Sequence, residues 1–189
     1  MAGNLIIISG PSGVGKSTVI RNLAQRIAAK ISISATTRQP GPSEKNGVDY
    51  HFLSRQEFEV MIQTGKLLEH AEYLGNFYGT PRDPVDQALK AGTDVILGIE
   101  VHGAKEVAKK FPDAIIICLC PPSDDELRRR LCDRARDDDA TIARRFDNAK
   151  REIELAKTAG IYKHWVVNGR LERAVDEIVT ICKQESYKK

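Results

Sequence analysis

The sequence predicts an α/β protein with a mostly parallel central sheet and helices on both faces. Three observations lead to this prediction. A continuous apolar run at 4–9 enters a glycine-rich turn and then an amphipathic helix, further apolar runs at 95–101 and 114–119 alternate with helical patterns, and no repeat interrupts the chain. Continuous apolar runs are typical of strands buried on both faces of a parallel sheet, and alternating strands and helices build doubly wound sheets.

The first part of the chain combines core elements with a small insertion. Residues 16–29 carry apolar side chains at helical spacing, and the alternating residues 31–36 are expected to form a second strand. A loop rich in proline and glycine follows, and the chain then changes character. We expect a strand at 48–53, a helix after a capping box formed by Ser54 and Glu57, and short strands at 67–74 and 76–80. Residues 37–80 are therefore expected to form a β-rich insertion outside the main sheet.

The remaining chain returns to helices and strands that alternate. The expected helices lie at 81–92, at 103–110, after a second capping box at Ser123 and Glu126, at 141–157 and at 171–184, with strands at 95–101, 114–119 and 165–167. The charged residues 134–140 lack apolar anchors and are expected to form a loop. The 189 residues suit a single domain, with core segments at about 1–36, 81–127 and 159–189.

Composition excludes several classes of protein. The net charge of +3 is too small to indicate general nucleic-acid binding, and no apolar run reaches the length of a membrane span. No signal peptide is recognisable, the four cysteines form no C-x-x-C pair, and the four histidines are scattered. These features predict a cytoplasmic protein with reduced thiols and without a metal cluster.

Residues 10–17 carry the pattern G-x-x-x-x-G-K-S, which is the phosphate-binding P-loop. Its glycines lack a Cβ atom, so that successive backbone N–H groups can face a polyphosphate, and the helix that follows adds its positive end. Lys16 is expected to reach the β- and γ-phosphates, and the Ser17 hydroxyl is expected to be a ligand of the accompanying Mg²⁺. The predicted triphosphate-binding residues are Gly10, Pro11, Ser12, Gly13, Val14, Gly15, Lys16, Ser17 and Thr18.

Further motifs narrow the class of P-loop protein. The N-K-x-D and D-x-x-G motifs of signalling GTPases are absent from the sequence. The chain instead contains S-G-P-S-G-V-G-K-S-T at 9–18, S-A-T-T-R at 34–38, N-G-V-D-Y-H-F at 46–52, L-E-H-A-E at 68–72, G-N-F-Y-G-T-P at 75–81, H-G-A at 102–104 and P-P-S at 121–123, followed by paired arginines. With these motifs the chain resembles a guanylate kinase over nearly its full length.

This resemblance implies a P-loop kinase fold with a GMP-binding insertion at about 37–80 and an arginine-rich helical lid at about 128–158. It also implies an activity: ATP donates its γ-phosphoryl group to GMP, and to dGMP, with Mg²⁺ as cofactor. The products are ADP and GDP, which serve guanine nucleotide synthesis and recycling.

The resemblance assigns residues of the insertion to GMP. The Arg38 guanidinium can bind two phosphate oxygens at once, and nearby hydroxyl groups supply further donors. The Glu69 carboxylate can accept the ring N–H and the amino group of guanine, a pair that adenine lacks, while Thr80 would donate to the 6-oxo oxygen. The implied GMP-binding residues are Ser34, Arg38, Tyr50, Glu69, Tyr78, Thr80 and Glu100.

The resemblance also assigns catalytic residues. Arg130, Arg134 and Arg145 occupy the phosphate-contacting positions of the family's lid. Together with Lys16 they would neutralise charge on the transferring phosphoryl group, and closure of the lid would exclude water.

The chain departs from the family pattern in three respects, which involve four positions. Gly41 stands where a second phosphate-binding arginine or lysine is usual, so we expect weaker GMP binding. Gly98 replaces the first of two usual acids and Glu100 lengthens the second; both are expected on one face of the strand at 95–101. His102 stands where glutamine is common, and its role stays open.

Two other functions stay open at this stage. The chain could be a related P-loop kinase with another acceptor, or a non-catalytic guanylate-kinase-like binding module, although such modules typically lose the P-loop that is intact here. The expected partners are small-molecule substrates, without nucleic acid or membrane, and the expected assembly is a monomer or homodimer.

Overall fold

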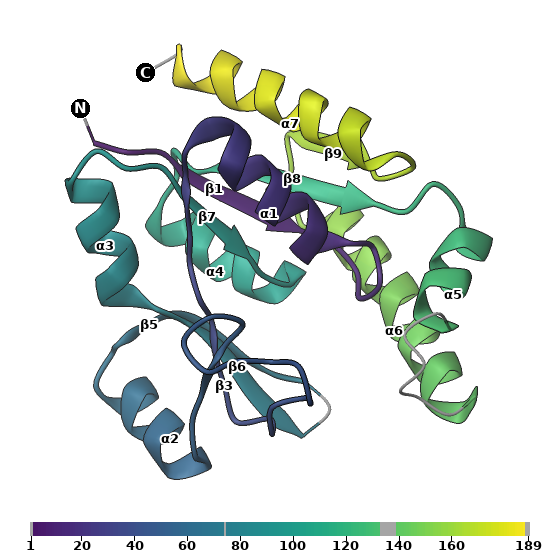
Figure 1. The fold of residues 1–189 in the computed structure, drawn as a ribbon, viewed down its shortest axis with the longest axis horizontal. Coiled ribbons are helices and arrows are strands. Elements are labelled where there is room, and N and C mark those ends of the chain that lie inside the picture. The colour runs from purple at the N-terminus through teal and green to yellow at the C-terminus, as the bar shows by residue number, and fades with distance from the viewer. Residues whose placement is uncertain (1, 74, 133–138, 188–189) are drawn as a thin grey trace.

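A computed structural model of the chain describes residues 2–73, 75–132 and 139–187 (Figure 1). Its main sheet contains five parallel strands in the order β2-β7-β1-β8-β9. These strands are β1 (Leu5–Ser9), β2 (Lys30–Ile31), β7 (Val95–Gly98), β8 (Ile115–Cys120) and β9 (His164–Val167). β1 lies at the centre and is buried throughout, as its apolar run predicts.

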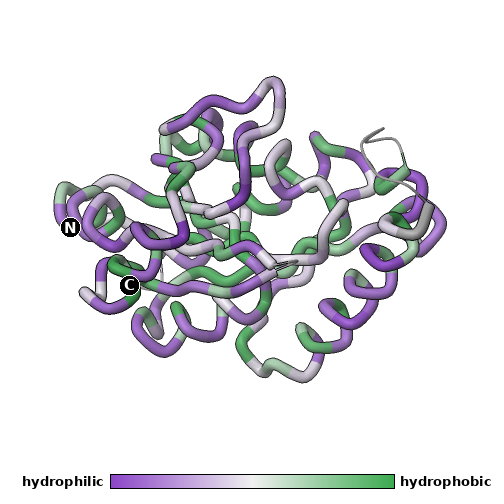
Figure 2. The backbone as a smooth tube through the Cα atoms, turned by 90° about the horizontal axis from the view of Figure 1, so that it is seen from below, coloured by the Kyte–Doolittle hydropathy of each residue, from purple (hydrophilic) through white to green (hydrophobic). Residues whose placement is uncertain are grey.

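Helices cover both faces of this sheet, which confirms the predicted class. Ile6 and Ile8 of β1 face α1 (Lys16–Ile27) and α7 (Leu171–Ser186), while Leu5 and Ile7 face α3 (Arg82–Lys90) and α4 (Val101–Lys110). α6 (Asp139–Thr158) packs beside α4, and α5 (Asp124–Cys132) packs on α6. Figure 2 shows hydrophobic residues along the central strands and hydrophilic residues on the outward turns of the helices.

A second, smaller sheet forms beside the first. Its order is β4-β3-β6-β5, and α2 (Arg55–Gln63) packs against it through Phe58. The strands are β3 (Ala35–Thr36), β4 (His51–Phe52), β5 (Leu67–Tyr73) and β6 (Asn76–Pro81). β5 and β6, which correspond to the two short strands expected here, pair in antiparallel fashion. The capping box before α2 is present: the Ser54 N–H donates to Glu57 Oε2 at 2.7 Å, and the Glu57 N–H donates to Ser54 Oγ at 3.2 Å.

The structure corrects three expected strands. The single strand predicted over 31–36 is two short strands in different sheets, because the chain leaves the main sheet after Ile31 and pairs with β6 from Ala35. The strand predicted over 95–101 ends at Gly98, and the one predicted over 48–53 covers only His51–Phe52. An alternating pattern of six residues looks the same whether it belongs to one strand or to two short strands in different sheets.

Two further findings concern the helices. α6 begins at Asp139, two residues before the predicted helix, and residues 134–138 of the expected loop lie outside the described residues. Among the described residues, none of the helices combines the length and apolar character that crossing a bilayer requires.

Candidate active site

A cleft of about 1070 Å³ lies between the small sheet and the carboxyl ends of β1, β2 and β7. Ligand sites of parallel α/β sheets occur at this edge, where the connecting loops meet. The cleft brings together most of the residues that the sequence singled out. Those that line it are Pro11, Ser12, Gly13, Gly15, Lys16, Ser17, Ser34, Arg38, Tyr50, Glu69, Tyr78, Glu100 and Arg145.

The P-loop coils around the Lys16 ammonium group. Lys16 Nζ donates to the carbonyl oxygen of Gly10 and, at 3.1 Å, to that of Pro11. Gly10 and Gly15 adopt φ angles of 146° and 95°, and a Cβ atom at Gly10 would lie 2.3 Å from the Leu119 carbonyl oxygen. The turn therefore requires glycine for both its conformation and its close packing.

Asn168, which follows β9, supports the back of the P-loop. Its buried side chain donates from Nδ2 to the Val14 carbonyl oxygen at 2.9 Å. Arg130 lies at the same place, where Nη1 donates to the Val14 carbonyl at 3.3 Å and Nη2 to the Asn168 carbonyl at 2.9 Å. Its Nε also donates to Glu126 Oε1 at 2.8 Å. Arg130 is not among the residues that line the cleft.

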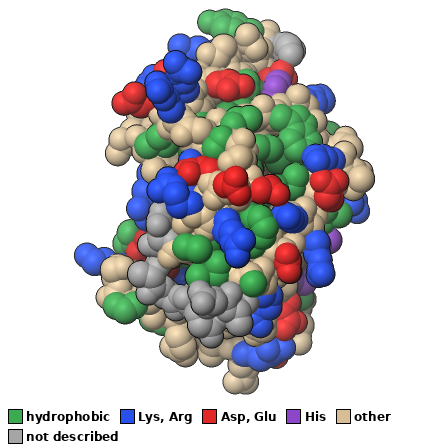
Figure 3. Space-filling view, turned by 90° about the vertical axis from the view of Figure 1, so that its right-hand side faces the viewer, with side chains coloured by type: hydrophobic (Ala, Val, Ile, Leu, Met, Phe, Trp, Pro, Cys, Tyr) green, Lys and Arg blue, Asp and Glu red, His purple; other side chains and the backbone are tan. Residues whose placement is uncertain are grey.

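Of the other two lid arginines, Arg145 on α6 lines the cleft, and Arg134 lies outside the described residues. Figure 3 shows acidic and basic side chains interspersed over the face that carries α5 and α6. Ion pairs on this face join Glu126 to Arg129 at 2.8 Å and Asp124 to Lys150 at 3.5 Å.

The residues expected to bind the GMP phosphate gather on one wall of the cleft. The Arg38 guanidinium lies 5.5 Å from the centre of the Tyr50 ring, and the rings of Tyr50 and Tyr78 lie edge to face with their centres 6.1 Å apart. Burial raises the pKa of Tyr50, so its hydroxyl keeps its proton and can donate. Ser34 lines the same wall.

Glu44 is a member of this wall that the sequence reasoning missed. Its two carboxylate oxygens accept from Arg38 Nη2 at 2.9 Å and Nη1 at 3.0 Å, and this pairing raises the pKa of Arg38. Oε2 also accepts the Gly41 N–H at 2.6 Å. The carboxylate thus occupies the bidentate face of Arg38 that a phosphate would use.

The base-reading carboxylate is nearly enclosed. Glu69 is 6% exposed, and its Oε1 accepts from Thr80 Oγ1 at 2.6 Å. Burial raises the pKa of Glu69 to about 7. Thr80 is 1% exposed, and its hydroxyl donates to Glu69.

Gly98 and Glu100 both line the cleft but do not share a strand, contrary to expectation. β7 ends at Gly98, and Glu100 is the N-cap residue of α4. A Cβ atom at Gly98 would lie 2.5 Å from Ile20 Cδ1. The described residues contain no group of three or more His, Cys, Asp or Glu side chains placed to hold a metal ion.

Glu152 is a second carboxylate that the sequence reasoning missed. It lies on α6, where burial and the neighbouring Glu100 raise its pKa to about 7, opposed by Lys16 and by a hydrogen bond from the Ser12 N–H. Its sequence context, a charged helix, is typical of solvated carboxylates, so no local signal marks it.

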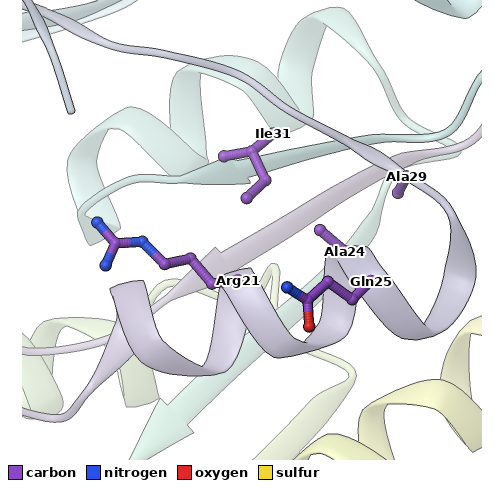
Figure 4. A pocket seen from close by; sticks show the side chains of 5 residues that line it. All are labelled: Arg21, Ala24, Gln25, Ala29 and Ile31. Atoms are coloured by element: carbon purple, nitrogen blue, oxygen red, sulfur yellow. The ribbon is translucent and has the colours of Figure 1, made fainter. Parts of the chain in front are cut away.

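A second depression, beside α1 and β2, is shallower and holds about 430 Å³ (Figure 4). It is lined by Arg21, Ala24, Gln25, Ala29 and Ile31. Arg21 is its charged residue, and the remaining lining offers no acid, base or nucleophile. The chemistry therefore belongs to the larger cleft.

Comparisons with known proteins show the family of the chain. The guanylate kinase family model matches residues 2–185. A guanylate kinase from Bacillus subtilis (strain 168) is 48% identical over 189 residues, which cover 99% of this chain and 91% of that protein. One from Desulfitobacterium hafniense (strain Y51) is 45% identical over 184 residues, covering 97% and 90%.

A solved guanylate kinase structure has a similar fold. The crystal structure of guanylate kinase from Anaplasma phagocytophilum superposes with a TM-score of 0.78 at 31% identity, covering 97% of this chain and 86% of that one. A structure of an uncharacterized protein from Eubacterium ventriosum, at 14% identity and a TM-score of 0.56, shares the fold alone. The chain therefore belongs to the guanylate kinase family.

Proposed function

We propose that the central cleft is where the chain carries out its guanylate kinase activity, the transfer of the γ-phosphoryl group of ATP to GMP. One observation carries this assignment. The P-loop, with Lys16 and Ser17, and the wall that holds Arg38 and the buried Glu69 line the same cleft. A phosphoryl donor and a guanine acceptor can therefore meet inside it.

The P-loop residues from Gly10 to Thr18 would hold the ATP phosphates. Lys16 already lies inside the coil of the loop, bonded to two carbonyl oxygens, and would shift toward the β- and γ-phosphates. The hydroxyl of Ser17 and the carboxylate of Glu100 are hard oxygen donors that line the cleft and suit Mg²⁺. When bound, Mg²⁺ would neutralise phosphate charge and orient the donor.

The opposite wall would hold GMP. Arg38 would exchange the Glu44 carboxylate for the GMP phosphate, assisted by the hydroxyls of Ser34, Tyr50 and Tyr78. At the other end of the nucleotide, Glu69 in its ionised form would accept the two adjacent N–H groups of guanine. Thr80 would hold this carboxylate in place through the 2.6 Å hydrogen bond.

Catalysis would come from positive charge around the transferring group. Lys16 and Arg145 line the cleft and would stabilise the charge that develops on the phosphoryl oxygens. Arg130, which also bonds the P-loop carbonyl of Val14, and Arg134 would contribute further positive charge from the lid, as the resemblance implies. The lid at about 128–158 would exclude water, and the insertion at about 37–80 would carry GMP, over a core of about 1–36, 81–127 and 159–189.

The cellular setting is part of the proposal. The substrates are the small molecules ATP and GMP, and we propose that a cytoplasmic monomer or homodimer acts on them without nucleic acid or membrane. The four free cysteines, two of them buried, suit a reducing compartment. The small net charge gives no electrostatic basis for nucleic-acid binding.

A coupled assay for ADP release tests the function. ADP should form much faster when GMP is present than when it is absent, and GMP and dGMP should be used in preference to AMP and UMP. Lys16→Met should abolish turnover. ATP consumption that does not respond to GMP would contradict the proposal. A faster reaction with another acceptor would indicate a related kinase, and failure to bind ATP would indicate a binding module.

A further inference from the structure

We propose that Gly103 is a specificity-determining residue of the GMP site, because its missing side chain provides the space in which the Glu69 carboxylate is held. The inference rests on the proposed function and names a positioning residue within it. Gly103 lies in the first turn of α4, is buried, and lines the cleft beside Glu69.

Two elements that are distant in sequence, β5 and α4, approach each other closely at this position. A Cβ atom at Gly103 would lie 2.4 Å from Glu69 Oε2, 2.9 Å from Glu69 Cδ and 3.2 Å from Glu69 Cγ. Non-bonded carbon atoms rest at about 3.5–4.0 Å. A methyl group at position 103 would therefore overlap the base-reading carboxylate itself, at the oxygen that Thr80 does not hold.

The Glu69 carboxylate has little freedom to retreat within its slot. Its Oε1 is held by the fully buried Thr80, and its backbone lies against Gly79, where a Cβ atom would be 2.9 Å from the Glu69 carbonyl oxygen. Avoiding a methyl group at 103 requires the carboxylate to rotate into the cleft. That rotation breaks the bond to Thr80 and turns Oε2 away from the guanine N–H groups.

The same geometry predicts that the substitution changes recognition more than folding. The overlapping atoms belong to the end of a side chain, which can rotate, and alanine is a better helix former than glycine. Gly103→Ala should therefore leave the protein folded, with Glu69 displaced. This separates a loss of guanine recognition from a loss of structure.

Gly103→Ala should raise the KM for GMP by about 10- to 100-fold, the effect of one lost charge-assisted hydrogen bond. The kcat, the KM for ATP and the thermal unfolding temperature should stay near those of the unchanged enzyme. Lys109→Ala, on the exposed face of the same helix, is the matched control and should change none of these. Calorimetric titration with GMP alone should show the same weakening as the KM.

A double-mutant cycle tests whether Gly103 acts through Glu69. Glu69→Ala removes the overlapping atoms, so Gly103→Ala should have no further effect on GMP binding in that background. An unchanged KM in the single variant, or an equal loss in both backgrounds, would overturn the inference while GMP-dependent turnover of the unchanged enzyme upholds the proposed function. An unchanged enzyme without GMP-dependent turnover would overturn both.

Discussion

At the scale of single residues, burial decides which chemical form a side chain takes. Glu69 is enclosed by the small sheet and α4, and with a pKa of about 7 it is poised between the neutral and the ionised form. Only the ionised form presents acceptors to both N–H groups of guanine. GMP binding should therefore be coupled to loss of the Glu69 proton.

The first prediction concerns this coupling. As the pH rises through about 7, the KM for GMP should fall, because ionised Glu69 binds guanine better. The GMP phosphate itself titrates near pH 6, so Glu69→Gln is measured in parallel to separate the two groups. A pH profile equally steep in Glu69→Gln would contradict the prediction, and Glu72→Gln, on an exposed position of the same strand, should behave like the unchanged enzyme.

The stability of the protein without ligand should also depend on the Glu69 proton, but it should decrease as the pH rises. The folded state retains the Glu69 proton up to a pKa of about 7, whereas the ordinary pKa of a glutamate carboxyl group is 4.5. The unfolded chain therefore binds fewer protons between these values, and the free energy of unfolding should fall as the pH rises across them. In denaturant titrations at several pH values, the free energy of unfolding of Glu69→Gln should fall less steeply with pH than that of the unchanged protein. An identical pH dependence in the two proteins would contradict the raised pKa.

Gly41 lies in the loop that carries Arg38, and its N–H donates to Glu44. Its φ angle is not in the left-handed region, so its backbone conformation does not require glycine. Gly41→Arg should lower the KM for GMP by about 10- to 100-fold, because an added charge-assisted hydrogen bond to phosphate contributes about 1.5–3 kcal/mol. Gln39→Arg adds the same charge at an exposed position of the loop and should have a much smaller effect. A KM for GMP that does not fall would contradict the expectation.

At the scale of elements, the P-loop depends on the segments behind it. The loop is short and glycine-rich, and its carbonyl at Val14 is held by Asn168 after β9 and by Arg130 of α5. Pre-organisation of the phosphate-binding amides is therefore shared by three segments that are far apart in the sequence.

A supporting role and a phosphate contact predict different effects of replacing Arg130. Arg130→Ala should lower the free energy of unfolding by about 1–3 kcal/mol, because two backbone carbonyls lose a charged donor. Arg129→Ala is the matched control, since Arg129 also pairs with Glu126 but its side chain is 64% exposed, and it should have little effect. A fall in kcat at unchanged stability would instead assign Arg130 to the phosphate alone.

At the scale of the whole molecule, two sheets meet at one cleft. The parallel sheet carries the P-loop, and the small mixed sheet carries Arg38, Tyr78 and Glu69. Leu68 of β5 packs into the core of the parallel sheet, and an ion pair between Arg21 of α1 and Asp49 of the insertion joins the two parts at 3.1 Å. Because the residues assigned to ATP and to GMP belong to different parts of the fold, each ligand should bind in the absence of the other.

Ligand-dependent stability tests this arrangement. ATP with Mg²⁺ and GMP should each raise the unfolding temperature, by an amount that corresponds to about 2.7 kcal/mol at a hundred times the Kd. Lys16→Met should remove the shift with ATP and retain that with GMP, and Glu69→Gln should do the reverse. Loss of both shifts in either folded variant would contradict two separable half-sites.

The sequence by itself determined the class of fold, the P-loop, the β5–β6 hairpin and the capped helix after Ser54. These features depend on local information, namely the period of apolar residues and the spacing of glycines and caps. Only the tertiary structure decided that Arg38 is paired with Glu44, that Arg130 lies behind the P-loop, and that Glu152 faces Ser12. It also divided residues 31–36 between two sheets. Such outcomes depend on which distant segments pack together, and on the water that this packing removes, and no local pattern contains that information.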